Sequence, residues 1–405
     1  MTAIPQALKG LKVIEVGGYA AGPWIGKVLA NYGATVIHIE ARDRPDGFRL
    51  QYPPYKDGKK GINRSGCFSY FNDSKYAVTL DIKKPGGLEL AHRLSDWADV
   101  LIENMRPGVI DRIGLGYEAL KKTNPGLIFL STCNMGQTGP RAATGGFGSQ
   151  LSALAGFCGL TGEAGGSPQL LYGPYIDFVA ALVAAPIILA ALDKRRRTGE
   201  GTFIDVSQYE CGCFFLAGPL FDYHANGNVI ERDSNADPVA APHNAYLCKE
   251  DEWIAASCWD AQEFGRLAET IGRPEWATDD RFTDADARRE NTSELDRGIA
   301  DWAKDQVAEQ AVAALQAANV HAYKVNTSAD LFNDAQLTHR KAWRVRKHPE
   351  IDYQAHYFPG FDLSEQPGDV TAPAPVIGQD NELVFREFLG LSEDEYKKLE
   401  KNGVL

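Results

Sequence analysis

The stretch "LKVIEVGGYAAGPWIGKVLANYGATVIHIEA", from Leu11 to Ala41, decides the fold of this chain. Its first six residues are a short apolar run that is typical of a buried strand, and residues 34–41 are a second such run. A glycine-rich turn and a helical pattern that ends at Gly33 lie between the two runs. A strand, a helix and a strand in this order predict a βαβ unit with two parallel strands.

The same alternation continues along the chain. Strands are predicted over "YAVTLDI" (76–82), "DVLIEN" (99–104) and "LIFLST" (127–132), and a helix over "GGLELAHRLSDWA" (86–98) separates the first two. Alternating strands and helices build a parallel sheet with helices on both faces. We therefore predict an α/β fold with a Rossmann-like large domain.

Ligands of open parallel sheets bind beyond the carboxyl ends of the strands. The candidate binding loops are those that follow Val16, Glu40, Glu103 and Thr132. The first of them, "GGYAAG" (17–22), resembles a nucleotide-binding turn, but Tyr19 breaks the G-x-G-x-x-G spacing of a dinucleotide site. Two other interpretations are a close turn between strand and helix, and a phosphate or pantetheine chain against the helix N-terminus.

The character of the sequence changes after Leu192. A polar stretch with proline and glycine at 226–242 predicts a linker, and a hairpin pattern with its turn at residues 249–252 follows. Three amphipathic helical patterns come next, so we predict a smaller α+β domain. We place the large domain at 1–200, the linker at 201–242, the small domain at 243–330, and a second linker with the C-terminal segment at 331–405.

Composition narrows the class of protein. The chain has 405 residues and a formal net charge of −12, which argues against broad contact with nucleic acid or an anionic membrane. Its longest apolar run, residues 178–192, is shorter than the roughly 20 residues that span a bilayer, so we expect a buried helix. Seven dispersed cysteines predict free thiols and no metal site. With no leader pattern at the N-terminus, we expect a cytoplasmic protein.

One acid, Asp177, stands at the start of that apolar run, in "YGPYIDFVAALVAAPIILAAL" (172–192). Its carboxylate can be a helix N-cap, which accepts hydrogen bonds from the free N–H groups of the first turn. It can equally be a nucleophile. The residue type and its position leave both interpretations open.

Two further segments carry residues suited to an anionic ligand. Arg106 and Arg112 bracket a Pro–Gly turn just after a predicted strand. An adenosine bisphosphate needs such cations, which Arg42 and Lys75 can join. The glycine-rich loop 131–148 can bring backbone N–H groups close to an oxyanion. For each single cation, a solvated surface charge is the alternative interpretation.

Taken together, these segments resemble the class III CoA-transferases, the family of formyl-CoA and carnitine CoA-transferases. The resemblance covers nearly the whole chain and includes "ADVLIENMRPGVIDRIGLGYEAL" (98–120), "NPGLIFLSTCNMGQTGP" (124–140) and "APVIGQDNELVFREFLGLSEDE" (374–395). In this family an aspartate just before an apolar, alanine-rich helix is the nucleophile. Asp177 stands at that place.

The resemblance implies that CoA is a substrate and not a permanently bound cofactor. It implies contacts to CoA from Tyr19, Ala20, Ala21, Pro23, Arg42, Lys75, Asn104, Met105 and Arg112. Phe147 falls where some relatives carry an aromatic residue that faces the nucleophile. Some relatives have a glutamine where this chain has Ala20, so details of the acyl pocket are not carried over.

The resemblance also implies a covalent mechanism. With an ordinary pKa of ~3.9, Asp177 would be ionised at pH 7 and would need no general base. Its carboxylate would attack an acyl-CoA to give a mixed anhydride, and the returning thiolate would give an aspartyl-CoA thioester. The acceptor acid would then take over the CoA.

The family fold is an interlocked dimer in which each chain forms a ring threaded by the other. It would return the C-terminal segment, within 331–405, to the large domain. Within the family, the pattern is most similar to the subunits that move CoA from succinyl-CoA to benzylsuccinate in aromatic compound degradation. Those enzymes pair two related chains. We therefore expect a homodimer or a hetero-oligomer with a related subunit.

Two alternatives remain. A 2-methylacyl-CoA racemase, an isomerase on a related fold, would need a histidine and an acid as paired bases. No histidine occurs between His92 and His224, where the loop that would carry it lies. The other alternative is a non-catalytic subunit of a hetero-oligomeric CoA-transferase.

Overall fold

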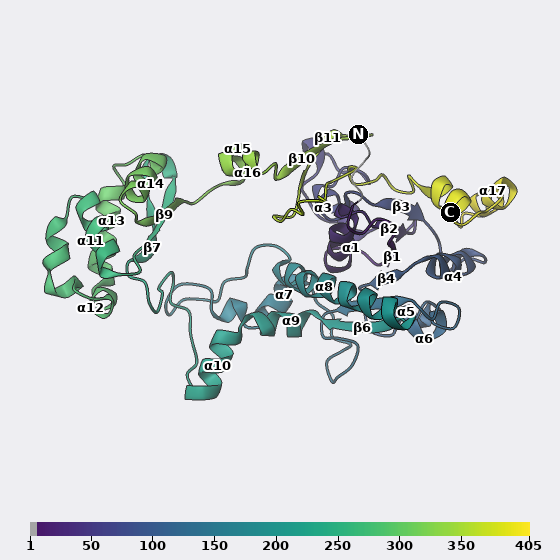
Figure 1. Ribbon diagram of the computed structural model, residues 1–405, viewed down its shortest axis with the longest axis horizontal. Helices are drawn as coiled ribbons and strands as arrows, with labels where there is room; N and C mark the ends of the chain where they lie inside the picture. The colour runs from purple at the N-terminus through teal and green to yellow at the C-terminus, as the bar shows by residue number, and fades with distance from the viewer. Residues whose placement is uncertain (1–5) are drawn as a thin grey trace. The chain divides into compact units, whose positions relative to one another are not determined.

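The computed structural model describes residues 6–405, which form two compact units. The large unit comprises the chain up to Gly159 together with Gln169–Ile230 and Thr338–Leu405. The small unit comprises Leu160–Pro168 and Glu231–Leu337. The colour gradient of Figure 1 shows that purple N-terminal and yellow C-terminal segments share the large unit.

A six-stranded parallel sheet forms the centre of the large unit, as the alternation of strands and helices predicts. Its strands are β1 (Lys12–Val16), β2 (Thr35–Glu40), β3 (Tyr76–Thr79), β4 (Val100–Glu103), β5 (Ile128–Cys133) and β6 (Thr202–Ser207). Their order is β3-β2-β1-β4-β5-β6. The chain therefore changes direction across the sheet between β1 and β4, where the loops after the two strands diverge and leave a crevice.

Helices cover both faces of this sheet. Helices α1 (Ala21–Asn31) and α8 (Tyr175–Thr198) bury apolar side chains on one face, where Ala180 and Ala184 are completely buried. Helix α4 (Gly87–Trp97) and the C-terminal segment Leu383–Phe388, labelled η6, cover the other face. Small side chains let α8 approach the sheet closely, which keeps its first turn beside the loops that follow the strands.

Helix α8 is longer than the apolar run at residues 178–192 predicts, and it is buried on one side only. It continues past Leu192 to Thr198 and ends at Gly199, which has a φ of 77°. The three arginines in its last turn are favourable because cations stabilise a helix C-terminus. Among residues 6–405 it is the one helix that is long and apolar enough to cross a membrane by length and composition. One side packs on the sheet, while Leu182, on the other, is 61% exposed.

The remaining elements of the large unit are short. They are α2 (Gly47–Leu50), η1 (Lys56–Gly58), α3 (Gly66–Asn72), α5 (Val109–Arg112), α6 (Tyr117–Leu120), α7 (Gly148–Leu154), η2 (Phe157–Gly159), α9 (Gln208–Phe215), α10 (Ala217–Asn226), β10 (Trp343–His348), β11 (Asp352–Tyr357) and α17 (Glu393–Lys401). Helix α16 (Ala335–His339) stands where the chain enters the large unit again. Residues 201–242, where we expected one linker, contain β6, α9 and α10, because "TFIDVS" pairs with the buried β5.

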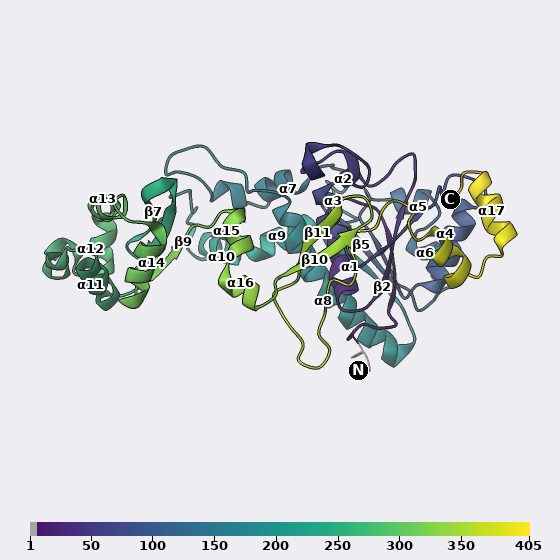
Figure 2. The same cartoon turned by 90° about the horizontal axis from the view of Figure 1, so that it is seen from above.

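The C-terminal segment lies on the large unit and closes an edge of the sheet. Strands β10 and β11 form an antiparallel pair beside α3, as Figure 2 shows, and Gln354 on β11 donates a hydrogen bond of 2.6 Å to Ser69 on α3. The backbone N–H of Ala77 on β3 donates to the Asp380 carboxylate at 2.8 Å. The N–H of Thr79 donates to the Asn381 amide oxygen at 2.8 Å. The outer edge of β3 is thereby satisfied by side chains.

The small unit has mixed α and β structure. Its antiparallel sheet consists of β7 (His243–Leu247), β8 (Trp253–Ser257) and β9 (His321–Lys324), in that order. The hairpin turn is the short segment η3 (Lys249–Asp251), where the sequence predicts it. The helical segments are α11 (Ala261–Thr270), η4 (Pro274–Thr278), η5 (Asp280–Phe282), α12 (Ala285–Glu290), α13 (Thr292–Ala303), α14 (Ala308–Ala317) and α15 (Ser328–Asn333). Their apolar sides and one sheet face form a single core.

Candidate active site

A cavity of about 810 Å³ opens on the large unit at the carboxyl end of its sheet. The loops after β1, β4 and β5 form part of its wall, and α2, residues 52–54, α3 and the starts of α7, α8 and α9 form the rest. Five residues singled out from the sequence line this one cavity, namely Tyr19, Ala20, Asn104, Phe147 and Asp177. The structure thus brings the first glycine-rich loop together with the aspartate.

Asp177 lies inside the first turn of α8 and does not cap the helix. The helix begins at Tyr175, the N-cap residue is Pro174, and no side chain caps this N-terminus. The N-cap interpretation of Asp177 is therefore wrong. The carboxylate instead packs against the backbone of Gly148 at the start of α7, where a Cβ atom would collide with Oδ2.

Burial changes the acidity of this carboxylate. The apolar surroundings of Asp177 raise its pKa to about 7, and the backbone N–H of the same residue opposes this only in part. The sequence analysis expected an ordinary pKa for Asp177, and the structure differs because the carboxylate is desolvated. Near neutral pH, about half of the molecules carry the ionised form.

The loop after β1 is held in an uncommon conformation. Tyr19 has a φ of 63°, a left-handed value that is rare for a residue with a side chain. Both carboxylate oxygens of Asp46 accept the backbone N–H of Tyr19, at 3.1 Å each. Asn104 accepts from the N–H of Gly18 at 3.1 Å and donates to its carbonyl at 2.6 Å. Asp46 belongs to no sequence motif, and the sequence analysis missed it.

Eight aromatic side chains contribute to the wall around Asp177. The cavity is lined by Tyr19, Phe48, Tyr52, Tyr70, Phe71, Phe147, Tyr172 and Phe178. The rings of Tyr19 and Phe147 meet edge to face at 5.7 Å, and those of Phe71 and Phe178 stack at 5.7 Å. Of these rings the sequence analysis named only Tyr19 and Phe147. The others come from α2 and the residues after it, from α3, and from residue 172 and the first turn of α8.

Lys75 lies away from the cavity, in the interior of the large unit. Its ammonium group is buried and donates to Glu15 at 2.9 Å, to the carbonyl of Pro23 at 2.7 Å and to Asn72 at 3.0 Å. This differs from the implied contact with CoA, because all three donor positions of the ammonium are occupied by the protein. The interaction links β1 to the start of α1 and so supports the loop that carries Tyr19.

The other implied CoA contacts lie outside the cavity wall. Ala21 and Pro23 are buried in the first turn of α1, and Met105 packs in the core below the sheet. Arg42 and Arg112 are exposed to solvent, and the Nε of Arg42 donates to the carbonyl of Leu405 at 3.4 Å. Contacts between CoA and these five residues stay predictions.

The wall of the cavity carries a single acid and few other ionisable groups. Of the described residues 6–405, none of those that line it is a histidine, lysine or arginine. The paired histidine and acid that a racemase needs are therefore not formed here. Within the same described range, no group of three or more His, Cys, Asp or Glu is placed to hold a metal ion.

Comparisons with known proteins agree with one another. The sequence model described as CoA-transferase family III matches residues 8–381. The chain is 33% identical over 401 residues to a succinyl-CoA–D-citramalate CoA-transferase of Chloroflexus aurantiacus, covering 99% of this chain and 98% of the relative.

A two-subunit enzyme and a solved structure extend these matches. The alpha subunit of a succinyl-CoA–L-malate CoA-transferase of Chloroflexus aurantiacus is 31% identical to this chain, and the alignment covers 98% of this chain and 92% of the subunit. The beta subunit is 30% identical, and its alignment covers 100% of this chain and 99% of the subunit. The crystal structure of a CAIB/BAIF family protein from Brucella suis superposes with a TM-score of 0.87 at 30% identity, covering 95% of this chain and 100% of that one.

Proposed function

We propose that this chain moves CoA from succinyl-CoA to a carboxylic acid that carries an aromatic ring. The premise of the proposal is that the chain belongs to CoA-transferase family III and is a CoA-transferase. Benzylsuccinate is the acceptor that we propose. The observation that carries this function is the juxtaposition of one ionisable carboxylate, Asp177, with a cavity that eight aromatic side chains line. CoA enters this reaction as a substrate.

Asp177 is the proposed nucleophile. Its carboxylate attacks the thioester carbonyl of succinyl-CoA, the C–S bond breaks, and the CoA thiolate leaves an aspartyl–succinyl anhydride. The thiolate then attacks the aspartyl carbonyl, which releases succinate and gives an aspartyl-CoA thioester. The acceptor carboxylate displaces the thiolate to form a second anhydride, and attack of the thiolate on the acceptor's carbonyl completes the transfer and frees the aspartate.

The surroundings of Asp177 support this sequence of steps. Each anhydride is lost if water attacks it, and the aromatic rings around the carboxylate keep water away. The raised pKa of Asp177 means that the carboxylate is poorly solvated, which leaves it more reactive than an aspartate in water. The contact with Gly148 leaves the carboxylate within the first turn, facing the cavity.

The size and lining of the cavity support an aromatic acceptor. The citramalate and malate of the relatives' names are aliphatic acids, and those names describe those proteins. In this chain, eight aromatic side chains line a cavity of about 810 Å³. Aromatic rings bind well against tyrosine and phenylalanine in stacked or edge-to-face arrangements. A phenyl group on the acceptor therefore gains contacts that an aliphatic diacid does not.

We also propose how and where the enzyme works. Two different subunits of one malate CoA-transferase are each about 30% identical to this chain, which supports a dimer with a second copy or with a related subunit. The interlocked arrangement implied by the family resemblance is the dimer that we propose. All seven cysteines are free thiols, which supports a reducing cytoplasm.

The decisive experiment traps the covalent intermediate. The protein is incubated with succinyl-CoA, quenched with hydroxylamine and digested, and the peptide that carries Asp177 is examined by mass spectrometry. We expect an aspartyl hydroxamate at residue 177 that is absent in Asp177→Asn. Asp193→Asn is the matched control, because Asp193 lies on the same helix, pairs with Arg197 and is exposed.

The same experiment separates the alternatives. A hydroxamate at Asp177 followed by CoA transfer to benzylsuccinate supports the proposal, and transfer to malate or citramalate alone would replace the proposed acceptor. Absence of the hydroxamate with succinyl-CoA and other acyl-CoA donors, both alone and beside a related subunit, would make this chain a non-catalytic subunit.

A further inference from the structure

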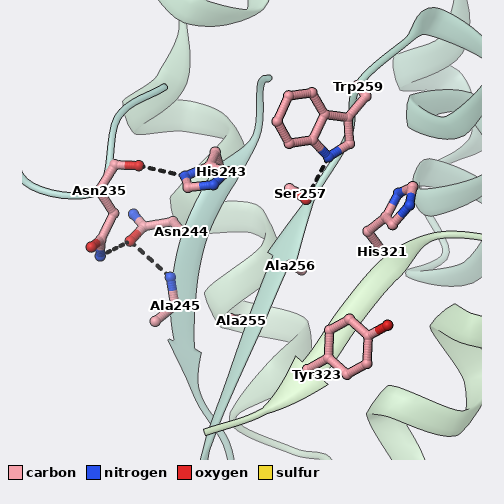
Figure 3. Close-up of a pocket in the computed structure, with 10 residues that line it drawn as sticks. All are labelled: Asn235, His243, Asn244, Ala245, Ala255, Ala256, Ser257, Trp259, His321 and Tyr323. Carbon is pink, nitrogen blue, oxygen red and sulfur yellow. Dashed lines mark hydrogen bonds between the residues drawn. The ribbon is translucent and has the colours of Figure 1, made fainter. Parts of the chain in front are cut away.

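A second cavity, of about 300 Å³, lies entirely on the small unit. One face of the β7-β8-β9 sheet packs against helices and buries Tyr246, Ile254 and Ala322. The cavity lies on the opposite face, and its wall includes His243, Ser257, Trp259, His321 and Tyr323 (Figure 3). In the middle of the sheet this face carries the small side chains of Ala245 and Ala255, which form the base of the cavity. The larger side chains surround them.

Three of these residues form a row across the sheet. His243 on β7 pairs with Ser257 on β8, and Ser257 pairs with His321 on β9. Directly opposed residues of neighbouring strands point to the same face. The two histidines are therefore about 10 Å apart, two strand spacings, with the serine hydroxyl between them.

Each imidazole is fixed by a hydrogen bond at Nδ1. His243 donates from Nδ1 to the carbonyl of Asn235 at 2.6 Å, which Figure 3 shows as a dashed line. His321 donates from Nδ1 to the Glu263 carboxylate at 2.6 Å. Glu263 is itself buried and also accepts the backbone N–H groups of Trp259 and His321. Within residues 6–405 the Nε2 atoms have no hydrogen-bond partner, so both remain for a ligand.

The remaining groups of the cavity suit an organic anion. Ser257 accepts a hydrogen bond of 3.2 Å from the indole of Trp259, which leaves the serine proton to donate. The side chains of Trp259 and Tyr323 are 48% and 67% exposed and offer apolar surface. The chain contains 54 acidic residues, yet none of the residues that line this cavity is acidic. An anion bound here meets donors and no lining carboxylate.

We propose that this cavity binds the carboxylate of a small organic acid between His243 and His321, with the body of the acid against Trp259 and Tyr323. The choice of a diacid as ligand rests on the proposed function. Succinate and benzylsuccinate each have two carboxylates, and only one of them exchanges CoA. The other carboxylate has no cationic partner in the cavity of Asp177, because none of the described residues that line it is cationic. The binding itself is independent of CoA transfer.

Binding takes up protons at the imidazoles. Because Nδ1 of each histidine already donates, Nε2 can donate to a carboxylate only after it gains a proton. The charged groups that interact with the row are Glu263 on α11, which accepts from His321 at 2.6 Å, and Asp237, whose carboxylate interacts with His243.

The test uses the full chain without CoA. Succinate is titrated while the indole N–H signal of Trp259, assigned with Trp259→Phe, is followed by NMR; succinamide is the neutral control of the same size. We expect saturable shifts with succinate and none with succinamide. Calorimetry in buffers of different ionisation enthalpy should show proton uptake. His243→Gln with His321→Gln should weaken binding at least tenfold, whereas His224→Gln, on exposed α10, should not.

Three outcomes overturn the proposal: no shift of the Trp259 signal, equal shifts with succinamide, or wild-type affinity in the double variant. Circular dichroism of the variants excludes unfolding as the cause of lost binding, and the succinamide comparison needs no variant. The result is separate from the proposed function, because the hydroxamate at Asp177 is measured without reference to the small unit. Asp177→Asn should bind succinate at this cavity as the unchanged chain does.

Discussion

The carboxylate of Asp177 rests against the backbone of Gly148, and no side chain fits between them. A Cβ atom at residue 148 would collide with Oδ2 of Asp177 and would stand 3.1 Å from the Cα of Pro174. Gly148 begins α7, and Asp177 lies in the first turn of α8. Two segments that are distant in sequence thus fix the position of the proposed nucleophile, and the glycine is needed for space.

Replacing Gly148 with alanine should displace the carboxylate without unfolding the protein. Misplacement of a reacting group by about 1 Å costs roughly a hundredfold in rate. We therefore expect kcat/KM of Gly148→Ala to fall by about a hundredfold or more, with unchanged circular dichroism. Gly218→Ala is the control, because a Cβ there meets no atom within 4 Å. Retention of more than half of the activity in Gly148→Ala would contradict the contact.

The raised pKa of Asp177 predicts how the rate depends on pH. Only the ionised carboxylate is a nucleophile, and a pKa of about 7 keeps it protonated in acid, so activity is gained as pH rises through 7. From pH 6 to pH 8 the ionised fraction, and with it kcat/KM for succinyl-CoA, should rise about tenfold. An ordinary aspartate would give a flat profile over this range, and that result would refute the desolvation of Asp177.

Substitution of Lys75 should affect stability and not CoA binding. Lys75→Met removes one of the two partners of the buried Glu15 carboxylate and leaves His38, at 3.0 Å, as the other. Loss of one partner from a buried ion pair costs about 3–5 kcal/mol of unfolding free energy, measurable by urea denaturation. The double variant with Glu15→Gln should recover part of this loss, and the exposed Lys83→Met should be neutral. A higher KM for succinyl-CoA with unchanged stability would instead favour the phosphate contact that the family resemblance implies.

Phe147 should discriminate between acceptor acids. Its ring is 54% exposed at the cavity and touches Tyr19, so it can contact the ring of a bound acceptor. In Phe147→Ala we expect about a tenfold loss in kcat/KM for benzylsuccinate, the worth of one aromatic contact. CoA exchange between succinyl-CoA and labelled succinate should change less than twofold. Phe214→Ala, 76% exposed on α9, is the control. Equal losses with both acids would assign Phe147 a structural role.

The central sheet was predictable because its signals are local. The pattern of Leu11–Ala41 encodes β1, α1 and β2 in consecutive residues. The alternation that follows extends the same reasoning to β3, β4 and β5. The role of Asp177 as a nucleophile stays a prediction, which the family resemblance implies. Helix α8 was expected to end earlier, because its basic last turn looks like a loop when the helix dipole is ignored.

The rest of the site depends on contacts between distant residues. The burial of Lys75 follows from Glu15, which stands 60 positions earlier, and no local pattern distinguishes this lysine from an exposed one. Asp46 holds Tyr19 across 27 positions through a short loop without periodicity. The aromatic wall likewise combines rings from five separate segments. Their convergence is a property of the tertiary structure and was not visible in the sequence.

The outer edge of β3 is completed by Asp380 and Asn381, and the backbone N–H of Asp81 donates to Val404 at 2.7 Å. A nascent chain therefore emerges from the ribosome with this edge unpaired until almost the whole sequence has been translated. Open strand edges pair readily with other chains. Premature termination between residues 208 and 380 would leave a translation product that contains the aspartate and all residues of the cavity wall but presents an unpaired strand edge to other chains.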